Sequence, residues 1–456
     1  MDTSLPLIKQ GHSGDSNVSS DGVDRISKLP DEVLSHILSY LTTKQAVATS
    51  ILSKRWEYLW TFTTNLDFSD QIPYNFLDEN EWGTKLRSFK DFVDRVIFYH
   101  GESTIQKCHL HTRQLYSNIY PWVCAVITCN VQELSIQGCS FAFQQLPWRL
   151  FACKTLVVLK IRGKFMLDLP TRICYPFLKI LSLNGVVYMS DASMDRLFSG
   201  CPVLEELEII RRTEDGVQIM KINTPSLKKL TIHYKVGHSE NEHKTQLNTP
   251  FLEYLKFSGK SGGYSMNCSS SLVEAHIYGG CDLDLLNGIS KVQHLVLNGQ
   301  IMQDLLIIIG YHGLPKFNNL KKIELNVDNP LDWEVLPDLL ECSPNLQVLV
   351  FPEGLAVMPE ECANDYCHLQ WYRPDCMPEC LLYHLKTVEI FKFAGQPCDL
   401  DIVRFLLKYG EVLECMNIHC FDCSTRPIMR KELDGAISEV SNFKRCSSAC
   451  KLAFFA

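Results

Sequence analysis

The spacing of apolar residues along this chain changes once, near residue 62. Across residues 25–62 apolar residues recur three or four positions apart, which is the period of amphipathic helices. Across residues 63–351 short apolar groups recur instead with polar residues between them, as in strands that bury one side. The pattern predicts a small helical module followed by a long succession of strands.

Three short helices are predicted in the helical module. Pro30 suits the first turn of the first helix, where a missing N–H costs nothing. Thr42 or Thr43 is expected to cap the second helix, and Ser53 the third. The apolar positions of the three helices are Val33, Leu34, Ile37, Leu38, Leu41, Ala46, Val47, Ile51, Trp56, Leu59 and Trp60. Helices this short cannot shield all of them, so part of this surface contacts another protein or packs against the following domain.

The strand region repeats one motif: an apolar residue, two others, an apolar residue, one other, and a third apolar residue. The middle positions are Cys108, Leu134, Leu159, Leu181, Leu207, Leu230, Leu255, Ala275, Leu295, Ile323, Leu349, Val388 and Met416. From 108 to 349 they lie 20 to 28 residues apart. Leucine-rich repeats, each with one strand on a shared sheet, have this length, whereas strands of an ordinary sandwich lie closer together.

Five proline dipeptides precede these motifs at matching distance. Proline is expected at the first position of each strand, where no ladder hydrogen bond is needed. The dipeptides are Tyr175-Pro176, Cys201-Pro202, Thr224-Pro225, Thr249-Pro250 and Ser343-Pro344.

The helical module closely resembles a plant F-box, down to its ending Ser53-Lys54-Arg55-Trp56-Glu57-Tyr58-Leu59-Trp60. The resemblance implies binding to the Skp-type adaptor of a cullin–RING ubiquitin ligase. By matched position, it implies that the docking face is formed or supported by Leu29, Pro30, Leu34, Ile37, Leu38, Leu41 and Trp56.

The end of the chain resembles the FBD region that follows the repeats in plant F-box proteins, and a capping role would cover the last repeat. An α/β repeat fold is therefore expected, with a three-helix F-box, a leucine-rich-repeat solenoid and an α+β FBD cap. The predicted divisions are a disordered leader at 1–24, the F-box at 25–62, the solenoid at 63–351, an insertion at 352–371 and the cap at 372–456.

The residues between the buried positions should line the concave face of the solenoid, because strand side chains alternate. Tyrosine and histidine on a rigid sheet offer contact area at little entropic cost. The predicted target-binding residues are Tyr254, Lys256, His276, Tyr278 and His294. The alternative is a solvated surface, with the partner bound elsewhere.

Composition narrows the function further. The net charge is −8, with no basic stripe, so no nucleic acid is expected as a partner. The sequence contains neither a secretory signal nor a membrane span, so the protein is expected in the nucleus or cytoplasm. Its 20 cysteines are scattered, and only Cys420 and Cys423 have the gap of a zinc knuckle. No metal or other cofactor is expected.

No catalytic motif stands out, so the chain is not expected to be an enzyme. The resemblance implies a substrate receptor that holds an unknown target protein near the ubiquitin-transferring subunits. Two alternatives remain: a hormone-type receptor that needs a small-molecule co-ligand, and a binding scaffold outside any ligase.

Overall fold

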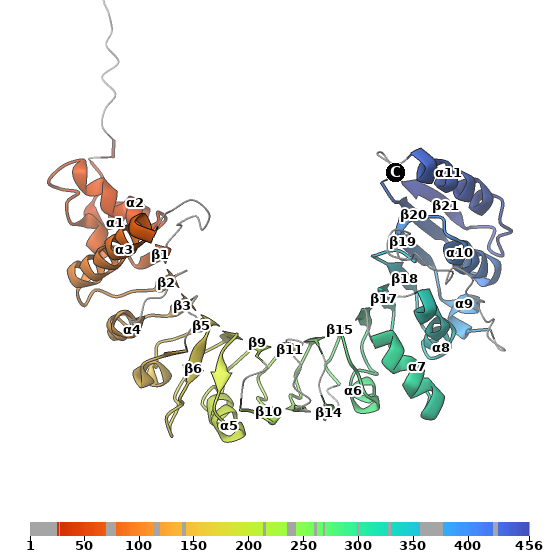
Figure 1. The fold of residues 1–456 in the computed structure, drawn as a ribbon, viewed down its shortest axis with the longest axis horizontal. Coiled ribbons are helices and arrows are strands. Elements are labelled where there is room, and N and C mark those ends of the chain that lie inside the picture. Colours follow the sequence, from red (N-terminus) through yellow and green to blue (C-terminus); the bar gives the residue numbers. More distant parts are fainter. Residues whose placement is uncertain are drawn as a thin grey trace, which may run out of the picture.

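The computed structural model is an arc built on one long parallel sheet (Figure 1). It describes residues 25–26, 28–69, 79–112, 119–138, 143–212, 216–234, 243–259, 262–267, 270–298, 301–326, 330–355, 377–422 and 427–455. The predicted leader and the predicted insertion, apart from 352–355, lie outside these residues. Among the described residues, no helix is both long and apolar enough to cross a bilayer.

The main sheet has 15 strands, all parallel, and neighbouring strands follow one another along the chain. They are β1 (Asn65–Ser69), β2 (Lys107–Thr112), β3 (Glu133–Gly138), β5 (Val158–Gly163), β7 (Ile180–Asn184), β9 (Glu206–Arg211), β11 (Lys229–Tyr234), β13 (Tyr254–Ser258), β15 (Glu274–Tyr278), β16 (His294–Asn298), β17 (Lys322–Asn326), β18 (Val348–Phe351), β19 (Thr387–Phe393), β20 (Cys415–Cys420) and β21 (Lys451–Phe455).

The repeated motif places these strands as predicted. Every apolar position of the thirteen motifs is buried, and the last two apolar positions of each motif lie in a strand of the main sheet. In β9, β11 and β13, for example, Leu207, Leu230 and Leu255 are paired in register and form one row of the core. Each fully buried leucine contributes about 1.5–3 kcal/mol, so the shared row stabilises every repeat through its neighbours.

One strand of the sheet, β1, was not predicted. Its Leu66 and Phe68 are buried, but the position where the motif has its first apolar residue is Thr63. The motif is therefore incomplete. The strand forms nevertheless, because it pairs with β2, in which Cys108 lies opposite Leu66.

The five prolines lie in turns ahead of the strands, so their predicted place at the first strand position was wrong. In each case the N–H of the motif's first leucine donates to the carbonyl of the residue before the proline, at 3.2–3.4 Å. Proline thus occupies the second position of a four-residue turn, where its fixed φ is favourable.

The outer side of the arc carries helices and two small sheets. The two sheets are three-stranded and parallel, made of β4 (Gln144–Gln145), β6 (Phe165–Leu167) and β8 (Val187–Tyr188), and of β10 (Ile219–Asn223), β12 (Lys244–Asn248) and β14 (Gly263–Met266). The helices are α4 (Ile119–Thr128), α5 (Asp191–Ser199), α6 (Leu283–Gly288), α7 (Ile301–Tyr311) and α8 (Leu336–Glu341), with the 3-10 helices η3 (Trp148–Ala152) and η4 (Pro330–Val335). Figure 1 shows the main sheet along the inner, concave rim.

The helical module differs from its prediction in one element. Helices α1 (Asp31–Leu38) and α2 (Thr43–Ala48) form, and α2 continues as the 3-10 helix η1 (Thr49–Ile51). Thr42 caps α2 through a reciprocal pair of hydrogen bonds with Gln45. The third predicted α-helix is instead a series of turns ending in the 3-10 helix η2 (Leu59–Phe62). This tighter path buries Leu59 and Trp60 beneath α1 and α2.

Helix α3 (Glu79–His100) lies between β1 and β2 in the chain and packs against η2 and α4, and three further helices cover the other end. These are α9 (Glu379–Tyr383), α10 (Pro397–Tyr409) and α11 (Pro427–Ser441). The two longer ones each bury one apolar side, with Val403 and Leu407 in α10 and Leu433 and Val440 in α11. Strand β21 is the last strand of the main sheet at this end.

Candidate functional site

Helix α1 has one buried and one exposed apolar side. Leu34 and Leu38 are 0% and 2% exposed and point into the core of the module. Ile37 and Leu41 are 44% and 38% exposed. Together with Val33 and Tyr40 they form a row with helical spacing, here called the α1 stripe.

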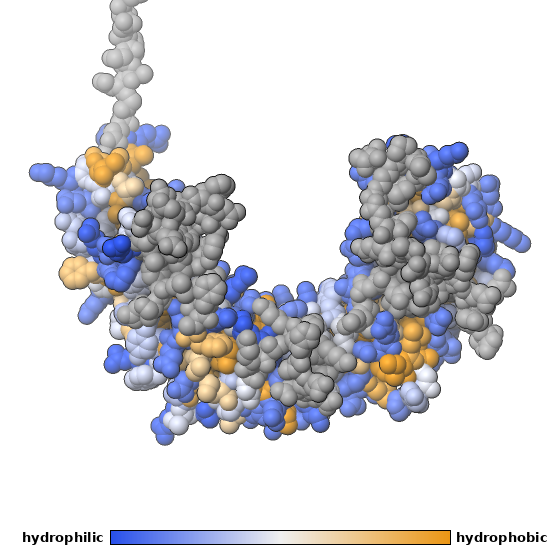
Figure 2. Space-filling model, viewed as in Figure 1, coloured by the Kyte–Doolittle hydropathy of each residue, from blue (hydrophilic) through white to orange (hydrophobic). Residues whose placement is uncertain are grey.

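The α1 stripe belongs to a module with an unusually apolar exterior. Ile26, Ile51 and Leu52 are also more than half exposed. Figure 2 shows apolar atoms gathered at the outer end of the module, beside the start of the described chain. Soluble proteins seldom expose so many large apolar residues in one small unit unless a partner covers them.

The seven predicted adaptor-binding residues differ in how far they are exposed. Leu34, Leu38 and Trp56 are buried and support the module from within. Leu29 is half-buried, and Pro30, Ile37 and Leu41 are exposed. Pro30, Ile37 and Leu41 can therefore contact an adaptor directly, whereas the buried residues hold helix α1 in place.

Arg55 ties the two ends of the module together. Its Nε donates to Asp31 Oδ1 at 2.8 Å, and its guanidinium also donates to the carbonyl of Leu29. Asp31 begins α1, so this pair fixes where the helix starts and which side it exposes. Arg55 and Asp31 are half-exposed, so the pair contributes mainly orientation rather than stability.

The concave face is formed by the strand residues that alternate with the buried motif positions. Lys160, Glu208 and Lys256 lie in one row across β5, β9 and β13, because the strands are paired in register through Ser182 and Thr231. Figure 2 shows the inner rim of the arc mostly in hydrophilic colours. This face is a polar surface on a rigid support.

The structure brings all five predicted target-binding residues together. The ring of His276 lies 5.2 Å from Tyr254, 6.2 Å from Tyr278 and 5.8 Å from His294, measured between ring centroids. Lys256 Nζ lies 5.0 Å from the centre of the Tyr278 ring, a cation–π contact. These five residues are here called the His276 cluster.

Two glutamates complete the His276 cluster and were not among the predicted site residues. Glu274 Oε1 contacts His276 Nε2 and lies 3.4 Å from His294 Nδ1. Glu324 Oε1 lies 3.1 Å from His294 Nε2 and 2.6 Å from Lys322 Nζ. Alternation within β15 places Glu274 on this face, but only the register of β16 with β17 shows that Glu324 reaches His294.

Partial burial changes the acid–base behaviour of this surface. It raises the pKa of Tyr254 and of Tyr278, with nearby glutamates adding to the effect. Burial also acts to raise the pKa of Glu324, but hydrogen bonds and charge from Lys322 and His294 outweigh it and lower that pKa. At neutral pH the cluster therefore holds neutral tyrosines beside an ionised Glu324.

A small polar cleft lies on the concave face beside the cluster. Its volume is about 200 Å³ and it is lined by residues of β5, β7, β9 and β11. Lys160 and Lys229 contribute positive charge, and Glu206 and Glu208 negative charge. Sites for drug-sized ligands usually enclose about 300–1,000 Å³, so this cleft is small for an organic co-ligand.

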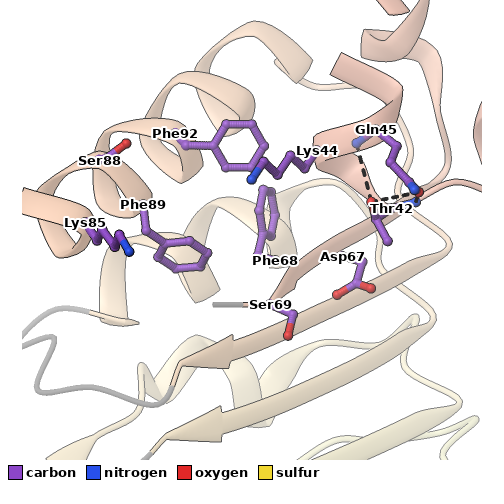
Figure 3. Close-up of a pocket in the computed structure, with 10 residues that line it drawn as sticks. All are labelled: Thr42, Lys44, Gln45, Asp67, Phe68, Ser69, Lys85, Ser88, Phe89 and Phe92. Atoms are coloured by element: carbon purple, nitrogen blue, oxygen red, sulfur yellow. Dashed lines mark hydrogen bonds between the residues drawn. The ribbon is translucent and has the colours of Figure 1, made fainter. Parts of the chain in front are cut away.

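A larger cavity, of about 680 Å³, lies where the helical module meets the sheet. Figure 3 shows Phe68, Phe89 and Phe92 around it, with Lys44 and Lys85 from α2 and α3. It is amphipathic, with aromatic walls and lysine ammonium groups. The cavity lies at the N-terminal end of the arc and away from the His276 cluster.

The cysteines of the described chain mostly serve packing. Burial raises the pKa of Cys201 and of Cys380 to about 12, so both thiols stay protonated at neutral pH. Cys420, one end of the zinc-knuckle spacing, is half-buried, and its neighbour His419 is stacked between Phe391 and Phe455, with centroid distances of 4.3 and 4.6 Å. Cys423, the other end of the knuckle spacing, lies outside the described residues.

Comparison with known protein families identifies three matching regions. A family model described as F-box domain matches residues 26–63, and one described as FBD matches residues 373–418. A third, described as FBD-associated F-box protein At5g56370, LRR repeats, matches residues 119–351. The three matches occur in the predicted order along the chain.

Relatives from Arabidopsis thaliana align over most of the chain. FBD-associated F-box protein At4g10400 is 32% identical, covering 95% of this chain and 100% of that protein. F-box/FBD/LRR-repeat protein At5g56420 is 31% identical, covering 94% and 99%. F-box/LRR-repeat protein At3g59210 is 34% identical over 86% of each chain.

Proposed function

Because this chain belongs to the F-box/FBD/LRR family, we propose that it is a substrate-receptor subunit of a cullin–RING ubiquitin ligase. The F-box would bind a Skp-type adaptor, and through it the cullin and RING subunits. The concave face of the repeats would bind the target protein. The chain would supply proximity, holding the target beside the ubiquitin-carrying enzyme, and no bond-making chemistry of its own.

The observation that carries this proposal is the α1 stripe. Val33 and Ile37 of α1, and Tyr40 and Leu41 just after its end, are exposed, whereas Leu34 and Leu38 of the same helix are buried. Burying such a row against a partner contributes about 25 cal/mol per Å² of apolar surface, which suits a stable interface. Leu34, Leu38 and Trp56 support it from inside the module.

The His276 cluster supports the second half of the proposal. It presents tyrosine, histidine and lysine side chains in a fixed arrangement, and aromatic residues dominate the binding energy of many protein interfaces. A hormone-type receptor has less support, since the concave cleft is only about 200 Å³. The larger cavity lies at the junction with the helical module rather than on the concave face.

Co-purification with a Skp-type adaptor and a cullin tests the proposal. We expect the wild type to recover both, and the double variant Ile37→Asp with Leu41→Asp to lose them by more than about 100-fold, because two charges would be buried at the interface. Ile307 and Tyr311 of α7 are also exposed and four residues apart. Ile307→Asp with Tyr311→Asp is therefore a matched control that should keep binding.

Two results would contradict the proposal, the first its function and the second its interface. One is a folded wild type that recovers no adaptor or cullin, which would favour the scaffold alternative. The other is full recovery by the Ile37→Asp with Leu41→Asp variant, which would remove the α1 stripe from the interface. Circular dichroism of each variant separates loss of binding from loss of fold.

A further inference from the structure

Three side chains at the centre of the concave face have the geometry of a metal site. Glu274, His276 and His294 each offer one ligand atom, and these three atoms all lie within 4.8 Å of one another. Glu274 is paired directly with His294 across β15 and β16, and His276 lies two residues further along β15. Both strands are in the interior of the 15-stranded sheet, so the three ligands start from a rigid backbone.

Both ring nitrogens of His294 face carboxylate groups. Its Nε2 lies 3.1 Å from Glu324 and its Nδ1 lies 3.4 Å from Glu274. A neutral imidazole has one N–H and can donate to only one of these carboxylates. The shorter distance assigns that hydrogen to Nε2, so the lone pair of Nδ1 faces the Glu274 carboxylate. A cation between them turns this repulsion into two ligand bonds.

Outer contacts hold both imidazoles as metal ligands are usually held. His294 Nε2 is bound to Glu324, which is itself held by Lys322. His276 Nδ1 lies 3.4 Å from the Tyr278 hydroxyl, which leaves Nε2 directed at Glu274. Metal-binding histidines typically donate their second nitrogen to such a partner, which fixes the tautomer and the ring orientation.

We propose that Glu274, His276 and His294 bind a divalent transition-metal ion of the zinc class. Two imidazoles and one carboxylate suit zinc better than calcium or magnesium, which prefer oxygen ligands throughout. Three protein ligands leave the fourth tetrahedral position open, as in zinc sites that accept an external ligand. Here that position faces the concave space, where water or a carboxylate or imidazole of a bound protein can occupy it.

Zinc titration of the chelator-treated full-length chain tests this site. Thiol groups among the 20 cysteines can also bind added zinc, so the result is the difference in bound zinc between variants and not the total amount bound. We expect His276→Ala with His294→Ala to bind about one zinc equivalent fewer than the wild type, measured by calorimetry. The conservative variant Glu274→Gln should lose the same equivalent while keeping side-chain size.

Two further variants define the site. His109 and His111 lie together on the concave side of β2, with ring centroids 5.7 Å apart, so His109→Ala with His111→Ala removes two imidazoles elsewhere on this face and should leave zinc binding unchanged. Glu324→Gln should keep the equivalent and weaken its affinity about 10–100-fold, because it alters only the outer contact of His294.

The same titrations give the results that overturn the proposal. Equal zinc stoichiometry and affinity in the wild type, the double alanine variant and Glu274→Gln would place all zinc on the cysteines. A wild type that binds no zinc at this cluster, with a melting temperature independent of zinc, would leave Glu274, His276 and His294 as a hydrogen-bonded group without a metal. Neither outcome depends on adaptor binding, so this test and that of the ligase function are independent.

Discussion

The α1 stripe and the concave face are both exposed, but they present opposite chemistry. The stripe exposes Val33 and Ile37 from a helix of eight residues, and Tyr40 and Leu41 from the turn that follows it. The concave face exposes charged, imidazole and phenol groups from a sheet of 15 strands. Each surface is the outer half of an amphipathic element, with a helical period in one case and a period of two in the other.

The difference shows what each surface is suited to bind. Apolar side chains left outside a small module favour one permanent partner that buries them. Half-buried polar groups that already bond to each other favour a partner that replaces those bonds with equally good ones. The first kind of surface provides affinity, and the second provides selectivity between partners.

The largest expected effect is a difference in unfolding free energy between substitutions on the buried and exposed sides of α1. Leu34→Ala should lower the free energy of unfolding of the helical module by about 2–5 kcal/mol, because it leaves a cavity in the core. Val33→Ala, one residue earlier on the exposed side, should change it by less than about 0.5 kcal/mol. Urea denaturation followed by tryptophan fluorescence measures both, and similar values would mean that α1 has no distinct exposed side.

The fully buried carboxyl group of Asp399 differs in its acid–base behaviour from the half-buried glutamates of the concave face. Asp399 in α10 is fully buried, and burial raises its pKa to about 6. A raised pKa means that its contribution to stability is complete below about pH 4 and is lost as the pH rises through about 6. Two pKa units correspond to about 3 kcal/mol.

The test is the pH dependence of Asp399→Asn. Relative to the wild type, this variant should gain up to about 3 kcal/mol of unfolding free energy between pH 4 and pH 7, because it carries no charge to bury. Urea denaturation followed by circular dichroism at both pH values gives the difference. A difference that stays constant with pH would show that Asp399 titrates at an ordinary pKa.

On the concave face, Lys256→Glu with Tyr278→Ala should reduce target capture about 10- to 100-fold while the fold is retained, as expected for aromatic and charged interface residues. Target capture is measured by proximity labelling with and without proteasome inhibition, as the set of labelled proteins that inhibition stabilises. Tyr383→Ala with Lys431→Glu makes the same kinds of substitution on α9 and α11 and is the matched control, which should leave target capture unchanged. Unchanged capture by the first pair would place the target elsewhere.

The smallest effect concerns the cap that sets the start of α2. Thr42→Ala removes the hydroxyl that accepts from the Gln45 N–H and should lower module stability by about 1 kcal/mol. Thr42→Ser keeps that oxygen and should stay near the wild-type value. Thermal unfolding of both variants checks this. A loss in the serine variant as large as in the alanine variant would mean that methyl packing, not capping, matters here.

Much of the fold follows from local sequence because every repeat carries the same motif of three apolar positions. Each motif fixes a strand, and stacking of neighbouring motifs fixes the sheet. Strand β1 was not predicted because its motif lacks the first apolar residue and has Thr63 at that position. The turns around Trp56 were also missed, since an apolar spacing near three fits both an α-helix and a tighter 3-10 path.

The candidate sites were only partly predictable for a different reason. The alternation of side chains in β13, β15 and β16 is enough to assign Tyr254, His276 and His294 to one face. It does not give distances between strands. The approach of Glu324 to His294, and of His294 to Glu274, depends on the register of three separate repeats.

The sequence alone determined the helical module, the repeat and the set of side chains on each face, because these depend on periodicity within a few residues. The tertiary structure decided which apolar residues of α1 stay exposed and which polar residues of the concave face meet. Contacts between residues far apart in the chain require the stacked strands to set the separation and register of their side chains, and no local pattern contains that information.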